Sequence, residues 1–109
     1  MPNELTKADE ESNQALPIAQ PKADVYEGDD RAMLVAELPG VPKEKVELKV
    51  ERDRLTIQGD TGKLRFERSF TLNEAIDRDA IEARYSNGVL RVTLPFRKPT
   101  SQRISIQAA

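Results

Sequence analysis

The 109-residue chain contains no cysteine, no histidine and no tryptophan. The lack of cysteine excludes disulfide bonds and thiol chemistry, and the lack of histidine removes the usual general base. Both absences also remove the common zinc ligands. The five glycines are isolated, so no glycine-rich phosphate-binding sequence occurs. We therefore expect no enzyme, no catalytic residues, no metal and no cofactor.

The chain also lacks long apolar runs and a strong net charge. No run approaches the roughly 20 residues of a membrane-spanning helix. The first residues, MPNELTKADEES, are acidic and lack the apolar core of a signal peptide. A net charge of −2 gives no electrostatic case for nucleic acid or an anionic membrane as partner. We expect a soluble, cytoplasmic protein that binds neither.

The 19 acidic residues could in principle supply an acid–base pair. Most of them stand beside lysine or arginine, which is typical of a solvated surface. Asp77-Arg78-Asp79 fits either a cation site or a turn, and a turn is the simpler interpretation.

Composition divides the chain into three parts. Residues 1–22 are polar, carry three prolines and show no sustained period, which predicts a flexible arm. Residues 23–96 form the domain. Residues 97–109 form a tail with a basic bias.

Within the domain the apolar residues alternate with polar ones, which is the period of a half-buried strand. Val46, Leu48 and Val50, for example, alternate with charged residues. The run from Arg31 to Leu38 is apolar enough for a strand buried on both faces. Further strands are predicted at 25–27, 55–59, 64–72, 81–85 and 89–94, and single helical turns at 43–45 and 74–76. About seven short strands predict an all-β, immunoglobulin-like antiparallel β-sandwich.

The stretch AIEARYSNGVLRVTLP at residues 80–95 predicts a hairpin with its turn at Asn87-Gly88. Both residues tolerate the positive φ that a two-residue hairpin turn requires.

Arg68 stands on the apolar face of the strand 64–72, between Phe66 and Phe70. A charge there is costly unless it is paired. Either the guanidinium reaches solvent at a strand edge, or it forms a buried or interfacial ion pair, for which the arginine fork suits a carboxylate.

The tail carries a lone apolar pair, Ile104 and Ile106, separated by Ser105. In extended backbone both isoleucines point to the same side and can enter one groove. The pair fits a docking motif or a frayed terminus equally well on sequence alone.

Three segments together resemble the small heat-shock proteins, the α-crystallin or Hsp20 family. Ala83 with Asn87-Gly88-Val89-Leu90 is similar to the A-x-x-x-N-G-V-L signature, and FERSFTL at 66–72 is similar to the F-x-R-x-F-x-L-P strand, with Asn73 in place of the proline. The stretch VAELPGVPKEKVELKVERDRLTIQG at 35–59 also resembles the family. The resemblance implies an α-crystallin domain and an ATP-independent chaperone that binds partly unfolded proteins. The alternative is a non-catalytic interaction module of the p23-like co-chaperone type, which needs neither the signature nor the isoleucine pair.

The resemblance also implies the binding sites. Ile104 and Ile106 match the family's I-x-I motif, which docks between two edge strands of a neighbouring subunit. Transferred to this chain, the candidate groove residues are Val46, Leu48, Val50, Ile81, Ala83 and Tyr85. Arg68 and Phe66 are candidates for the dimer interface. Leu16-Pro17-Ile18 has the same aliphatic spacing as the tail, and we hypothesise that it competes for the same groove.

Two features depart from the bacterial, plant and archaeal members. Their long loop, which carries a strand that swaps into the partner, is reduced here to Asp60-Thr61-Gly62. The alternating strand 63–72 can instead pair with its own copy across a two-fold axis near Arg68, as in animal members. The arm of 22 residues, without aromatics, is short. We expect a homo-oligomer, at least a dimer.

Overall fold

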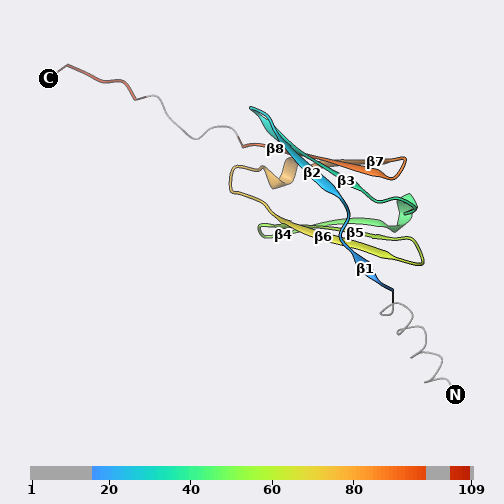
Figure 1. Cartoon of the computed structure of the whole chain (residues 1–109). Coiled ribbons are helices and arrows are strands. Elements are labelled where there is room, and N and C mark those ends of the chain that lie inside the picture. Colours follow the sequence, from blue (N-terminus) through green and yellow to red (C-terminus); the bar gives the residue numbers. More distant parts are fainter. Residues whose placement is uncertain (1–15, 98–103, 109) are drawn as a thin grey trace.

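The computed structural model describes residues 16–97 and 104–108, and in this part of the chain eight strands form two stacked sheets (Figure 1). The strands are β1 (Ile18–Ala19), β2 (Ala23–Glu27), β3 (Arg31–Glu37), β4 (Val46–Glu51), β5 (Arg54–Asp60), β6 (Arg65–Thr71), β7 (Glu82–Ser86) and β8 (Val89–Pro95). Two 3-10 turns, η1 (Lys43–Lys45) and η2 (Arg78–Ala80), are the helical elements here. Neither has the length or apolarity to cross a membrane. The predicted β-sandwich is confirmed.

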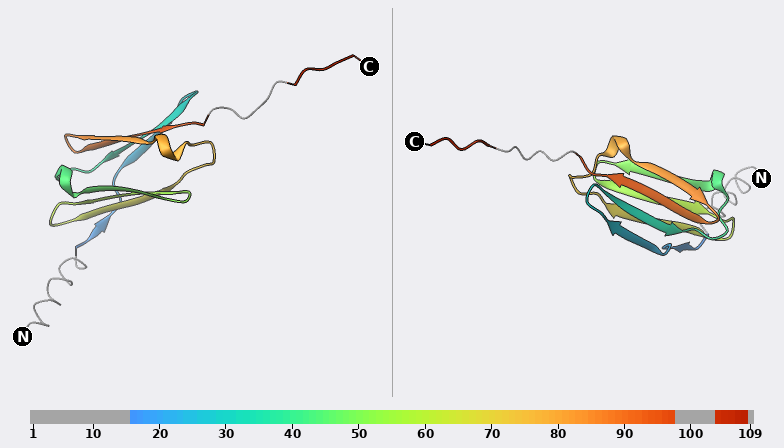
Figure 2. Two further views of the ribbon diagram at one scale, coloured as in Figure 1. Left: turned by 180° about the vertical axis from the view of Figure 1, so that it is seen from behind. Right: turned by 90° about the horizontal axis from the view of Figure 1, so that it is seen from above.

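Sheet A has the strand order β1-β6-β5-β4, and sheet B has the order β2-β3-β8-β7. All neighbours are antiparallel except β1 and β6, which pair in parallel with Ile18 opposite Arg65. Seen from above, β7 and β4 lie along one edge of the sandwich and β2 lies along the opposite edge (Figure 2). The two edges, rather than the faces, contain the candidate sites.

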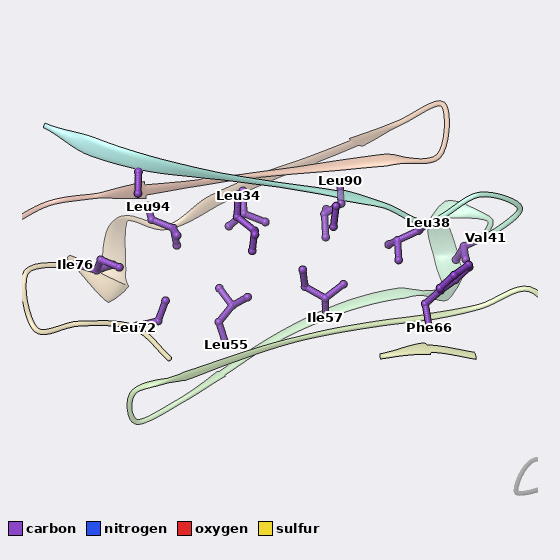
Figure 3. Packing of buried hydrophobic residues seen from close by; sticks show 13 residues of the cluster. Leu34, Leu38, Val41, Leu55, Ile57, Phe66, Leu72, Ile76, Leu90 and Leu94 are labelled. Carbon is purple, nitrogen blue, oxygen red and sulfur yellow. The ribbon is translucent and has the colours of Figure 1, made fainter. Parts of the chain in front are cut away.

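The core lies between the sheets, where 13 buried apolar side chains meet (Figure 3). Leu34 and Val92 from sheet B face Leu55 and Ile57 from sheet A, and each is at most 1% exposed. Full burial of one such side chain contributes about 1.5–3 kcal/mol. The core therefore joins the sheets through side chains that alternate along every central strand.

The prediction that the strand beginning at Arg31 is buried on both faces is wrong. Its burial alternates, and Met33 and Val35 lie half-buried on the outer face of sheet B. In the described part of the chain no third layer covers that face, so only the inward residues of β3 are fully buried.

The predicted hairpin at Asn87-Gly88 is confirmed. Asn87 has φ +52° and Gly88 has φ +77°, the positive values that the turn needs. The turn also contacts the loop after β3, because the Leu38 amide donates a 2.7 Å hydrogen bond to the Gly88 carbonyl oxygen.

The short connection between β5 and β6 forms a tight turn. The Gly62 amide donates to Asp60 Oδ1 at 2.6 Å, and the Thr61 amide donates to the Leu64 carbonyl oxygen at 2.9 Å. Gly62 has φ +90°, which favours glycine. This turn contains no additional strand that could exchange with a partner.

The segment predicted as a helical turn at 74–76 forms an isolated turn rather than a 3-10 helix. The Ile76 amide donates to the Asn73 carbonyl oxygen at 3.2 Å, and Ile76 also forms a β-bridge with Phe96. A 3-10 helix follows as η2, where Asp77 Oδ1 accepts a hydrogen bond from the Asp79 amide. Asp77-Arg78-Asp79 is thus the start of a turn.

Candidate functional site

Five of the six predicted groove residues lie on the inner faces of β4 and β7, the strands that end the two sheets on one side, and the sixth, Ile81, directly precedes β7. We call this region, formed by Val46, Leu48, Val50, Ile81, Ala83 and Tyr85, the β4/β7 edge. The register places Leu48 opposite Ile57 and Ala83 opposite Val92, and both partners are fully buried. Because directly opposite residues share a face, the alternating apolar residues of β4 and β7 point inward.

These inward residues differ in how well they are covered. Val46, Leu48, Ile81 and Tyr85 pack against the core. Val50 remains 38% exposed, and Ala83 is exposed as well. Apolar side chains that point inward and are still accessible mark a place where the sandwich is open.

Tyr85, at one end of the β4/β7 edge, is hydrogen-bonded to the loop that follows β3. Its hydroxyl lies 2.6 Å from the Val41 carbonyl oxygen and 3.0 Å from the Leu38 carbonyl oxygen, to which it donates. Burial raises the pKa of the Tyr85 phenol. Tyr85 therefore acts mainly as an anchor for the loop that follows β3, a role that its sequence position did not indicate.

The tail residues of the motif are accessible. Ile104 is 78% exposed and Ile106 is 96% exposed, and residues 104–108 have no regular secondary structure. The two largest apolar side chains of the described tail are therefore free to bind a groove.

Arg68 forms no ion pair within the described part of its own chain. Its Nη1 donates a 3.1 Å hydrogen bond to the Pro21 carbonyl oxygen, and its guanidinium lies 5.0 Å from the centre of the Phe70 ring. The side chain is half-buried on the inner face of β6. Among the described residues, the one ion pair joins Asp30 and Arg31. Their side-chain hydrogen bond, and after it the attraction between their opposite charges, lowers the pKa of Asp30 and raises that of Arg31.

The backbone edge of β6 is partly occupied. The Arg65 amide donates to the Pro17 carbonyl oxygen at 2.9 Å, within the pairing with β1. Backbone groups alternate in direction along a strand, so those of Ser69 and Thr71 point to the same side, beyond β1. Phe66 itself is 8% exposed and belongs to the core. A role of Phe66 and Arg68 in a dimer interface stays a prediction.

The proposed arm motif lies at the other side of the sandwich. Ile18 is in β1, on the edge of β6, and is 63% exposed, while Leu16 is half-buried. We call residues 16–22 the strap, because they run from sheet A to sheet B and include the fully buried Pro21. The motif is thus not next to the β4/β7 edge of its own chain, and competition for the edge of another copy stays a prediction.

The described residues contain no cluster of three or more histidine, cysteine or acidic side chains placed to hold a metal. No polar or charged residue of residues 16–97 and 104–108 is fully buried.

Comparison with known proteins decides the family. The model of the Hsp20/alpha crystallin family matches residues 24–108. The chain belongs to the Hsp20/α-crystallin family. Members of this small heat-shock family are chaperones, and the binding of client proteins is general among them.

The relatives support this assignment along most of the chain. The probable 15 kDa heat shock protein of Leptospira interrogans is 35% identical over 120 residues, covering 97% of this chain and 92% of the relative. Among solved structures, heat shock protein 16.0 from Schizosaccharomyces pombe has a TM-score of 0.68 at 32% identity, covering 94% of this chain and 92% of that one. A small heat-shock protein from Xylella fastidiosa, with a distinct high-order structure, has a TM-score of 0.70 at 29% identity. That match covers 84% of this chain and 99% of the Xylella chain.

Proposed function

We propose that this small heat-shock protein is an ATP-independent holdase that binds partly unfolded proteins and limits their aggregation under stress. The observation that carries the proposal is the β4/β7 edge, where Val50 and Ala83 point inward and remain accessible. Stress exposes apolar segments of other proteins, and such an edge can cover them. This mechanism needs no nucleotide.

We propose that the same edge binds the tail of another copy. Ile104 and Ile106 stand two residues apart, so both reach one groove in extended backbone. Burial of the two side chains contributes about 3–6 kcal/mol before the cost of ordering the tail. One contact is therefore weak and reversible, and several in one assembly reinforce each other through effective concentration. Exchange of tails would uncover edges for clients.

The assembly unit is proposed to be a dimer through β6. The two-residue strand β1 restricts this pairing. Antiparallel pairing of β6 with its copy either displaces β1 or uses the free backbone groups of Ser69 and Thr71. We further propose a cytoplasmic location, no catalytic activity, and neither nucleic acid nor membranes as partners.

A reductive aggregation assay tests the holdase directly. Insulin is reduced with dithiothreitol at 37 °C, and light scattering follows the aggregation of its B chain with and without the protein. The chain has no cysteine, so the reductant leaves it unchanged. We expect suppression without nucleotide, and the same suppression when ATP is added.

Two substitutions on β4 test whether the apolar edge is responsible. Val50→Lys, on the inner face, is expected to suppress insulin aggregation less than the wild type does. Lys49→Ala, on the outer face of the same strand, is the control and is expected to suppress it as the wild type does. Unchanged insulin aggregation with the wild type would contradict the holdase and favour the p23-like interaction module.

A further inference from the structure

The second edge of the sandwich, between β2 and β6, contains a mainly apolar cavity of about 120 Å³, which is open to solvent and is also lined by Glu27, Thr71 and Asn73. Val25 and Leu34 line it from sheet B, and Phe70 and Leu72 line it from sheet A. Its volume is close to that of the apolar cavity of about 150 Å³ that binds benzene in an engineered protein. It can therefore hold one aliphatic side chain.

This cavity lies where the strap stops covering the edge. The strap pairs with β6 at Arg65 and Phe66, and Arg68 contacts the carbonyl oxygen of Pro21. Beyond that point, Val25 is opposite the buried Leu34 and so faces inward, yet it is 55% exposed. The strap thus covers the edge beside the first residues of β6 and leaves an apolar opening beside Val25.

The backbone beside the opening can accept a strand. β2 is the last strand of sheet B on this side, so every second residue has an amide and a carbonyl without a ladder partner. An extended peptide that pairs with such an edge places alternate side chains on the inner face. One of them would then enter the cavity beside Val25.

The charge of this edge defines the partner further. Glu27 also lines the cavity and faces inward, opposite Ala32. Glu27 is the one charged side chain among the described residues that line the cavity, and residues 22–31 have a net charge of −2, whereas Arg68 of β6 places one positive charge beside Phe70. Val25 and Glu27 stand two residues apart on one face, so an aliphatic residue and a cation with the same spacing match them. The tail has its isoleucines at that spacing, whereas Arg103 directly precedes Ile104 and points to the opposite side in extended backbone.

We propose that the β2/β6 edge, meaning Val25, Glu27 and the cavity beside them, binds extended segments of partly unfolded proteins in which an aliphatic residue and a lysine or arginine stand two residues apart. This site for clients is distinct from the β4/β7 edge, which binds the tail. The inference rests on the proposed chaperone function and names one class of segment that the chaperone selects.

Peptide binding to the full chain tests the site without an aggregation assay. The probe is a fluorescein-labelled peptide, Thr-Lys-Thr-Ile-Thr-Lys-Thr, whose isoleucine has lysine two residues away in both directions. Its counterpart has glutamate in place of lysine. Fluorescence anisotropy is expected to show binding of the lysine peptide that weakens with salt, and binding of the glutamate peptide that is about tenfold weaker.

Matched variants assign the binding to one edge. Val25→Lys is expected to weaken binding of the lysine peptide about tenfold, more than Val50→Lys does at the inward valine of the opposite edge. Tyr26→Lys, on the outer face of β2, is expected to leave the affinity unchanged. Glu27→Lys, a surface substitution that leaves the core intact, is expected to reverse the preference between the two peptides. Glu51→Lys is the matched control and retains the preference of the wild type.

Several outcomes would overturn the inference. Unchanged affinity in Val25→Lys, or equal loss in Val50→Lys, excludes a separate site at β2. Binding of a peptide of residues 101–108 that depends on Val25 rather than Val50 would make this edge a tail site. If the lysine peptide binds as expected while insulin aggregation is unaffected, the holdase function is contradicted and the peptide site at the β2/β6 edge is supported. If insulin aggregation is suppressed while Val25→Lys and Glu27→Lys bind both peptides as the wild type does, the peptide site is contradicted and the holdase function is supported.

Discussion

The Arg68 guanidinium donates a hydrogen bond to the backbone carbonyl oxygen of Pro21, 47 residues earlier in the chain. Arg68 belongs to β6 in sheet A, and Pro21 lies in the strap that leads into β2 of sheet B. The contact therefore ties the strap to the sandwich at the point where the chain crosses from one sheet to the other.

Removal of this contact is expected to loosen the strap. Arg68→Ala leaves the Pro21 carbonyl without its donor and removes the packing of the guanidinium on Phe70, which should lower the free energy of unfolding by about 1–3 kcal/mol. Urea denaturation measures the change. Arg65→Ala, a half-buried arginine on the outer face of the same strand, is the control. Equal midpoints for the two variants would contradict a special role of Arg68.

Tyr85 is expected to link stability to alkaline pH. Its pKa is raised by burial above the usual value of about 10. The folded state therefore holds this proton more tightly than the unfolded state. The resulting stabilisation is present below pH 10 and is lost as the pH rises through the folded-state pKa. The phenolate also no longer donates to the carbonyl oxygens of Leu38 and Val41.

The variant Tyr85→Phe isolates this effect. At neutral pH it should lower the free energy of unfolding by about 1–2 kcal/mol, because the Val41 carbonyl loses its hydroxyl partner. Above pH 10 the difference from the wild type should shrink, as measured by urea denaturation at each pH. Tyr26→Phe, at a tyrosine that is 58% exposed, should change stability by less than about 0.5 kcal/mol. A constant difference at all pH values would argue against a titrating Tyr85.

Gly88 is required for the backbone conformation of the hairpin turn. Gly88→Ala should cost about 1–2 kcal/mol, because alanine is strained at φ +77°. Space is not the reason, since the nearest atom to an added Cβ, the Pro39 Cα, would be 3.6 Å away. Gly28→Ala, where φ is not left-handed, should be close to neutral. Thermal unfolding of both variants checks this, and a Gly88→Ala midpoint equal to that of Gly28→Ala would refute it.

The β4/β7 edge is expected to bind the tail as a peptide. The receiver is the full chain with Ile104→Ala and Ile106→Ala, so that its own tails do not compete, and the ligand is a labelled peptide of residues 101–108. Adding Val50→Lys or Ala83→Gln to the receiver should weaken binding at least about tenfold, because each places a polar group where an isoleucine would be buried. Val25→Lys should have no effect. Unaltered binding in Val50→Lys and Ala83→Gln would place the tail elsewhere.

Much of the sandwich was predictable because its signals are local. The alternation of Val46, Leu48 and Val50 identified the inner face of β4, and Asn87-Gly88 identified the hairpin. The pairing of β1 with β6 could not be predicted, because β1 has two residues, too few to show a period, and its partner is 47 residues away. The partner of Arg68 was missed for a related reason. Any residue provides a backbone carbonyl, so the Pro21 acceptor leaves no trace in the sequence.

The solution mass of the intact chain and of the Ile104→Ala/Ile106→Ala variant, measured by light scattering after size exclusion, tests the central claim most directly. Ser105→Ala/Gln107→Ala, at the alternate positions of the tail, is the matched control. Binding of the tail at the β4/β7 edge predicts an intact chain and a control larger than a dimer, and an isoleucine variant reduced to a dimer. Equal masses for all three would show that the tail does not hold the assembly together and would contradict the account.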